Sequence, residues 1–126
     1  MTEPAGELTE TDAEPELEPV YPDVQSWVEN LYIATFIRPD GQQLRWCAAW
    51  WAHPEAIIRL TALWQTWETA RLLPGVGIAD WLRTYLDTLA PALHSPTGPF
   101  ASCTPDKHTN QLPMPVTNPP PGYWER

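Results

Sequence analysis

Residues 53–75 decide the fold, and they read HPEAIIRLTALWQTWETARLLPG. Proline suits the first position of a helix and an acid suits the first turn, so Pro54 and Glu55 predict a helix that starts directly after His53. Pro74-Gly75 predicts the stop. Apolar residues between them recur at helical spacing and form a wide stripe of Ala56, Ile57, Leu60, Leu63, Trp64 and Trp67. The opposite face is polar, with Arg59, Gln65, Thr66 and Thr69.

Two further helices flank this one. The first is expected from Asp23, whose carboxylate can cap the backbone donors of the first turn, to about Ala34. The third is expected from about Ile78 to Ala90, where Pro91 bends or ends it. Between the first two, residues 38–41 (RPDG) predict a turn whose flanks either pair as a short β-hairpin or leave a bare turn. The expected fold class is therefore mainly α, a small three-helix domain.

Both ends of the chain differ in composition from its centre. Residues 1–23 contain eight acids and no base, so they carry −8 of the net charge of −9. Such a segment has little to bury, and we expect residues 1–22 to be a disordered acidic tail, either solubilising or interacting. Residues 105–126 hold six prolines, which exclude a helix or a central strand. The expected organisation is thus a tail over 1–22, a Trp-rich helical domain over 23–108 and an extended Pro-rich tail over 109–126.

Length and composition limit the class of protein further. The 126 residues fit one domain, and no apolar run approaches the roughly 18 residues that a membrane span needs. The acidic N-terminus lacks the basic region and apolar stretch of a secretory signal. Two cysteines make no disulfide framework. We therefore expect a cytoplasmic protein without a membrane partner.

Three blocks of this sequence carry a family resemblance. WCAAWWAHPEAIIRLTALWQTWE (46–68) is followed by ADWLRTYLD (79–87) and then by GPFASC (98–103), with His108 beyond. Over about residues 22–108 this pattern resembles the domain-of-unknown-function family 4913. The resemblance implies the setting of a small accessory protein in high-GC Gram-positive bacteria, their phages and mobile elements. It implies no reaction and no catalytic residues.

Four residues are candidates for a metal site. Cys47 and His53 are spaced C-x5-H, and Cys103 and His108 are spaced C-x4-H. Zinc favours four thiolate and imidazole ligands, and both pairs are expected in turns or at a helix end. A turn at Pro74-Gly75 makes the second and third helices antiparallel, which brings the two pairs to the same end. The alternative is structural: a buried apolar Cys47, a helix-capping His53, and two loop residues.

Signals for an enzyme are weak. No phosphate-binding glycine loop and no nucleophile motif is present, and His53-Pro54-Glu55 lacks the downstream cysteine pair of zinc deaminases. Basic residues are too few and too dispersed for nucleic acid.

The remaining signal is aromatic. Trp50 and Trp51 are adjacent, so one of them is a candidate for an exposed anchor of a protein partner. Residues 120–123 (PPGY) match the Pro-Pro-x-Tyr pattern, although so short a match arises readily by chance. We expect a non-catalytic accessory or interaction protein with a protein partner. The alternative is a zinc-stabilised structural or nucleic-acid-associated module.

Overall fold

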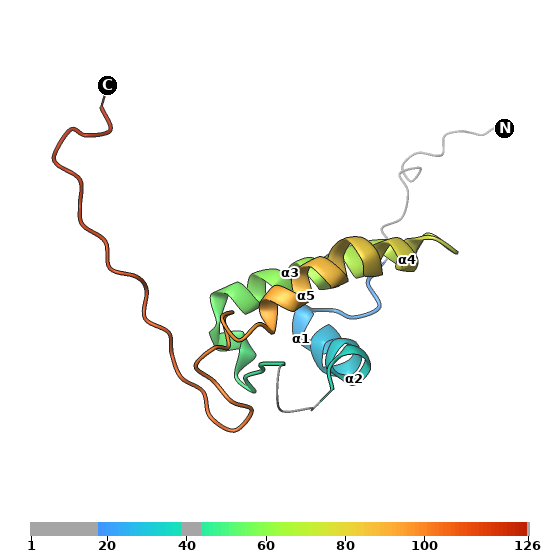
Figure 1. Ribbon diagram of the computed structural model, residues 1–126. Coiled ribbons are helices and arrows are strands. Elements are labelled where there is room, and N and C mark those ends of the chain that lie inside the picture. Colours follow the sequence, from blue (N-terminus) through green and yellow to red (C-terminus); the bar gives the residue numbers. More distant parts are fainter. Residues whose placement is uncertain (1–17, 39–43, 126) are drawn as a thin grey trace. The chain divides into compact units, whose positions relative to one another are not determined.

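The computed structural model describes residues 18–38 and 44–125 (Figure 1). Its first helical run consists of α1 (Val24–Trp27), the π-helical turn η2 (Val28–Tyr32) and α2 (Ile33–Phe36). The 3-10 turn η3 (Trp50–Ala52) leads into the long helix α3 (Pro54–Ala70). A third run comprises α4 (Gly77–Trp81), the π-helical turn η4 (Leu82–Leu86) and α5 (Asp87–Leu93). Because the described residues contain no strand beyond one isolated bridge, Thr104 to Lys107, the prediction of a mainly α fold is confirmed.

The first helical run begins as predicted. The Asp23 carboxylate accepts a hydrogen bond from the Ser26 backbone N–H at 2.8 Å, which is the expected cap. The run ends at Phe36, two residues beyond the predicted end, so Thr35 and Phe36 are helical and do not form a hairpin strand. The rest of the predicted turn, residues 39–41, lies outside the described residues.

The third run continues through the proline that was expected to bend or end it. Pro91 lies inside α5, and the helix closes only at Leu93, where the His94 N–H still donates to the Ala90 carbonyl at 3.1 Å. A proline removes one backbone donor, but Leu93 and His94 are both buried. The extra turn therefore places two core side chains, which compensates for the lost hydrogen bond.

The chain divides into two compact units, and each is described by itself. The first unit comprises the chain up to residue 38 together with residues 60–86. Trp27 is at its centre: its ring stacks on Tyr32 at 5.4 Å and meets Trp81 edge-on at 6.3 Å. Leu60 and Leu63 of α3 complete this core. Three aromatic and two leucine side chains thus make up much of the small core of this unit.

Two predicted helix faces need correction. Thr66 belongs to the buried side, because its hydroxyl and the Leu63 carbonyl both accept from the indole N–H of Trp81. Ile78 and Tyr85, whose helical spacing from Trp81 predicts the apolar face of the third helix, are instead exposed, and so is Ile57. The large Trp81 side chain reaches Thr66, a position that helical spacing assigns to solvent. The polar Thr66 side chain thereby becomes a hydrogen-bond partner of a buried ring.

The last residues of the predicted acidic tail contact the first unit. The backbone N–H groups of Val20 and Tyr21 each donate to the Glu68 carboxylate at 2.9 Å, and Arg71 donates to the Glu18 carbonyl. The Tyr21 ring also lies 5.6 Å from the Trp67 ring. Residues 1–17 of the predicted tail lie outside the described residues, whereas residues 18, 20 and 21 contact this unit.

The second unit comprises residues 39–59 and residues 87 onward. Its core lies around Phe100, whose ring meets His53 edge-on at 5.0 Å and Trp46 edge-on at 5.2 Å. His94 donates from Nδ1 to the Arg45 carbonyl at 2.9 Å, which ties the end of α5 to the segment before η3. Across residues 18–38 and 44–125, no helix is both apolar enough and long enough to cross a bilayer.

Candidate metal centre

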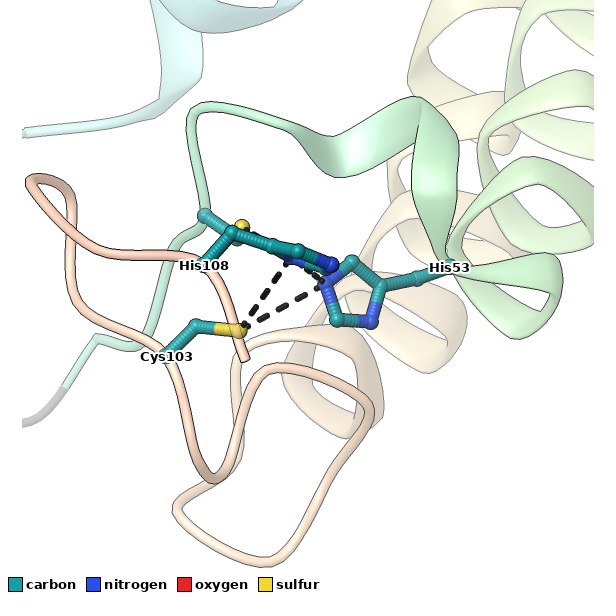
Figure 2. Close-up of side chains that lie close together, drawn as sticks. His53, Cys103 and His108 are labelled. Atoms are coloured by element: carbon teal, nitrogen blue, oxygen red, sulfur yellow. Dashed lines mark hydrogen bonds between the residues drawn. The ribbon is translucent and has the colours of Figure 1, made fainter. Parts of the chain in front are cut away.

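All four predicted ligands lie in the second unit, and the structure brings them together. Cys47 precedes η3, His53 separates η3 from α3, and Cys103 and His108 flank the turn that closes the Thr104–Lys107 bridge. Their four ligand atoms lie within 4.8 Å of one another. Figure 2 shows His53, Cys103 and His108 pointing toward a common point. The described residues therefore include one Cys2His2 cluster that can hold a metal ion.

The distances define which atom each residue offers. His108 presents Nδ1, which lies 3.2 Å from Cys47 Sγ, 3.8 Å from Cys103 Sγ and 3.2 Å from the nitrogen of His53. That nitrogen is Nε2, and it lies 3.5 Å from Cys103 Sγ. Two sulfurs and two nitrogens thus surround one small volume.

The side of each ligand that faces away from this volume is also bonded. His108 Nε2 lies 2.7 Å from Asn110 Oδ1, an acceptor, so Nε2 carries the proton and Nδ1 keeps its lone pair. The Thr109 backbone N–H donates to Cys103 Sγ at 3.3 Å, and the Ala49 backbone N–H donates to Cys47. Donors of this kind stabilise thiolates, which are the form that binds metal.

Burial sets the electrostatics of the cluster. Cys47, His53 and Cys103 are each at most 4% exposed, and His108 is half-buried. Burial raises the pKa of Cys47; the Ala49 N–H partly counters this, and the neighbouring Cys103 adds to it. Burial, reinforced by nearby His108, lowers the pKa of His53. The imidazole is therefore held neutral, whereas two thiols this close resist becoming thiolates unless a positive charge lies between them.

Direct hydrogen bonding cannot satisfy every close approach. The His108 Nδ1 lone pair, its proton being on Nε2, faces two sulfurs and a second imidazole nitrogen. It can accept from only one of them at a time. A cation at the centre would contact all four ligand atoms, two sulfurs and two nitrogens, at once. The geometry therefore suits a coordinated ion better than a hydrogen-bonded core.

Aromatic side chains support the cluster from one side. Phe100 lies against His53, and Trp46 lies against both Phe100 and His94, with ring centroids 5.2 and 5.8 Å away. His94 is buried, but its ring is held by the Arg45 carbonyl and it is not one of the four clustered residues. Burial is the largest influence on His94 and lowers its pKa.

The two candidate partner-binding tryptophans have opposite environments. Trp50 is 5% exposed and belongs to the core, whereas Trp51 is 63% exposed. Only Trp51 therefore presents its ring to solvent, as expected for adjacent residues. A partner contact by Trp51 remains a prediction.

Three residues of the site were missed by sequence reasoning. Asn110 and Thr109 orient ligands, and Phe100 packs on one of them. Asn110 was assigned to the Pro-rich tail, yet it directly follows Thr109 and lies two residues from His108. The sequence signal for Asn110 was the spacing H-x-N, which puts a short polar side chain two residues after a candidate ligand. A metal-binding histidine usually donates its second N–H to an oxygen, and the Asn110 side chain supplies one.

Comparison with known proteins places the chain in a family without a described activity. The family model described as "Domain of unknown function (DUF4913)" matches residues 21–121, a range that covers most of the described residues of both units and most of the Pro-rich segment. No curated protein and no solved structure matches the chain significantly.

Proposed function

The chain belongs to the domain-of-unknown-function family DUF4913, and for this member we propose a non-catalytic role in which a zinc ion holds the second unit together. Cys47, His53, Cys103 and His108 are its four ligands. The single observation that carries the proposal is the convergence of their two sulfurs and two nitrogens within 4.8 Å.

The ligand set and its spacing favour zinc. Zinc–nitrogen bonds of about 2.0 Å and zinc–sulfur bonds of about 2.3 Å make a tetrahedron with edges of about 3.3 Å between nitrogens and about 3.5 Å between nitrogen and sulfur. The nitrogens here are 3.2 Å apart, and three of the nitrogen–sulfur distances are 3.2, 3.5 and 3.8 Å. Two thiolates with two imidazoles are typical of structural zinc, whereas magnesium and calcium prefer oxygen.

A closed coordination shell argues against catalysis at this ion. Catalytic zinc keeps a position for water or substrate beside three protein ligands, whereas structural zinc takes four. Here four protein ligands surround the volume, and three of them are at most 4% exposed. Water would have no coordination position, so the ion would serve the fold.

The benefit to the fold is a long-range connection. The ion would join residues 47–53, before α3, to residues 103–108, beyond α5. The second unit has few large buried side chains besides Trp50, Leu93 and Phe100. Small domains with thin cores commonly depend on a metal or a disulfide, and both cysteines here are free. We propose that the zinc-stabilised unit presents exposed surface, including Trp51, to a protein partner.

The test is metal content together with stability. Protein purified without chelator should carry one zinc per chain, and cobalt in its place should give the visible absorption of a tetrahedral sulfur–nitrogen site. Cys103→Ser should lose both zinc and thermal stability, since binding and folding are coupled. A chelator should lower the melting temperature of the wild type.

His94→Gln is the matched control, because it changes a buried histidine of the same unit outside the cluster. It should keep a full complement of zinc even if it melts lower. Well under one zinc per chain, together with a melting temperature indifferent to chelation, would refute the proposal.

A further inference from the structure

The C-terminal arm, defined here as residues 110–124, exposes apolar side chains that nothing in the zinc proposal uses. Leu112, Met114 and Val116 are 83–89% exposed, and Trp124 is 80% exposed. The arm follows an extended trace without helix or strand (Figure 1). A solubilising tail has no need of large apolar residues, and disordered segments are usually depleted in them. Their exposure therefore marks a surface that is used in binding.

The arm is stiff by composition. Pro113 and Pro115 alternate with the three exposed side chains, and Pro119–Pro121 follow. Each proline fixes its own φ and restricts the preceding residue to extended conformations, so all of residues 112–121 except Val116 and Thr117 have few alternatives to the polyproline II conformation. At about 3.1 Å per residue such a helix spans about 28 Å. Little conformational entropy remains to be lost when it binds.

Charge decides between classes of partner. Residues 109–124 contain no charged side chain. Nucleic acid is bound largely through lysine and arginine at phosphates, and anionic membranes are bound through basic clusters. Neither mode is available here. An uncharged, apolar, proline-rich segment fits a protein groove.

The root of the arm is tied to the second unit, and its far end has a local turn of its own. At its root, His108 bonds Asn110, and the Gln111 side chain reaches the Gly98 carbonyl at 3.5 Å. At its far end, the Tyr123 N–H donates to the Pro120 carbonyl at 3.1 Å and closes a turn through Gly122, whose φ is +76°. This turn sets the rings of Tyr123 and Trp124 edge to face, with centroids 4.8 Å apart. The arm thus ends in a compact aromatic head.

We propose that the arm is a polyproline II ligand for a protein partner whose groove is lined with aromatic side chains. Proline rings and the Leu112 and Met114 side chains pack on flat aromatic faces, while the free arm carbonyls accept hydrogen bonds from tyrosine or tryptophan donors of the groove. The aromatic head occupies a second apolar pocket at the groove's end. The proposal rests on the proposed function only for the rigidity of the root, where zinc would fix His108.

The experiment uses the full-length protein in its native cell. The photoreactive residue p-benzoylphenylalanine replaces Met114 as the probe, and a matched probe replaces exposed Thr97 in the loop after α5. The expected result is one protein crosslinked through position 114 and not through 97, with the crosslink mapped to an aromatic-lined groove. That protein, purified, should bind the full-length chain directly. The double variant Pro113→Ala/Pro115→Ala should raise the dissociation constant at least about tenfold, since several proline contacts and the preformed helix are lost.

Pro96→Ala is the control variant, because it removes an exposed proline outside the arm. It should bind like wild type. Zinc content and melting temperature of the double variant should equal those of wild type, which separates this test from that of the metal site. The proposal is overturned by no specific crosslink at position 114, by a crosslink to nucleic acid or to a strand edge, or by equal affinity of the double variant and wild type.

Discussion

Glu68 has the most elaborate hydrogen bonding of the carboxylates in the described residues. It accepts from the backbone N–H groups of Val20 and Tyr21, from the indole of Trp64 and from the guanidinium of Arg71. Burial alone would raise its pKa, but these four donors outweigh burial, and the pKa is lowered from 4.5. Its donors from residues 20 and 21 lie 48 and 47 positions away, beyond the reach of helical spacing, so the sequence pattern of α3 does not indicate them.

We predict that Glu68→Gln destabilises the protein by about 1–3 kcal/mol, because hydrogen bonds to a charged acceptor are lost and the amide brings donors of its own. Urea denaturation measures this. Glu55→Gln is the control, since the Glu55 carboxylate is 50% exposed and makes only the Arg59 pair, which is worth about 1 kcal/mol or less. Equal effects of the two substitutions would mean that Glu68 is not the anchor of residues 18–21.

The same group predicts a pH dependence. Since the pKa of Glu68 is lower in the folded state, its stabilisation is present above 4.5 and is lost as pH falls through the folded value. The stability difference between wild type and Glu68→Gln should therefore shrink on acidification. A difference that stays constant across this range would contradict the assignment.

The adjacent residues Trp50 and Trp51 allow a second comparison of a buried side chain with an exposed one. Trp50→Ala should cost about 3–5 kcal/mol, because it empties a buried site, whereas Trp51→Ala should cost under about 1 kcal/mol. Thermal melts of the two variants measure this. If Trp51→Ala were as damaging as Trp50→Ala, the Trp51 ring would belong to the core and could not serve as a partner contact.

The helix elements depend on a few contacts at their ends. The Gly77 N–H donates to the Leu73 carbonyl at 3.0 Å, and Gly77 itself is buried against the end of α3. A Cβ at this position would overlap the Ala70 carbonyl oxygen and lie 2.9 Å from Leu73 Cβ. The connection between α3 and α4 therefore requires a glycine for close approach.

We predict that Gly77→Ala costs about 3 kcal/mol, since backbone atoms must shift. Gly75→Asn is the matched control: Gly75 has a φ of +86° with open space around its Cα, and asparagine tolerates this conformation. It should cost much less. Chemical denaturation of both variants measures the two losses in free energy of unfolding. Equal losses would show that the close approach of α3 to Gly77 can relax.

At the scale of the whole molecule, the contacts define how much chain folding requires. Residues 18–21 contact the first unit, and Thr109, Asn110 and Gln111 bond the second, so both sets extend beyond the predicted domain of residues 23–108. That residues 23–108 suffice for folding remains a prediction, which fragments of the chain can test.

A fragment of residues 18–111 should melt close to the full-length protein, because the chain beyond Gln111 is almost entirely exposed. A fragment of residues 22–108 should melt cooperatively but lower, since it lacks the Glu68 anchor and the Asn110 partner of His108. Calorimetry of the three proteins measures this. A full-length midpoint for the shorter fragment would mean that these peripheral contacts add nothing to stability.

Local information in the sequence determined the helices and the ligand set. Caps, helical spacing and proline placement located α1 and α3, and the spacing of Cys47, His53, Cys103 and His108 predicted the group that could hold a metal ion. These features succeed because backbone hydrogen bonding in a helix links residues only a few positions apart. The sequence was less informative at Pro91, where the preference for a stop is weaker than the burial of Leu93 and His94.

Tertiary structure alone decided which groups meet. Thr66 became the acceptor of Trp81, Glu68 bound a segment near the N-terminus, and Asn110 oriented His108. The meeting of residues 47–53 with 103–108 was predicted from the turn at Pro74-Gly75, whereas the bonds of Thr109 to Cys103 and of Asn110 to His108 depend on the fold of the loop. The physical reason is that the packing around a polar group determines which hydrogen-bond partner that group can reach. Their partners are fixed only once the whole unit has excluded water and set which acceptors lie within reach of each buried donor.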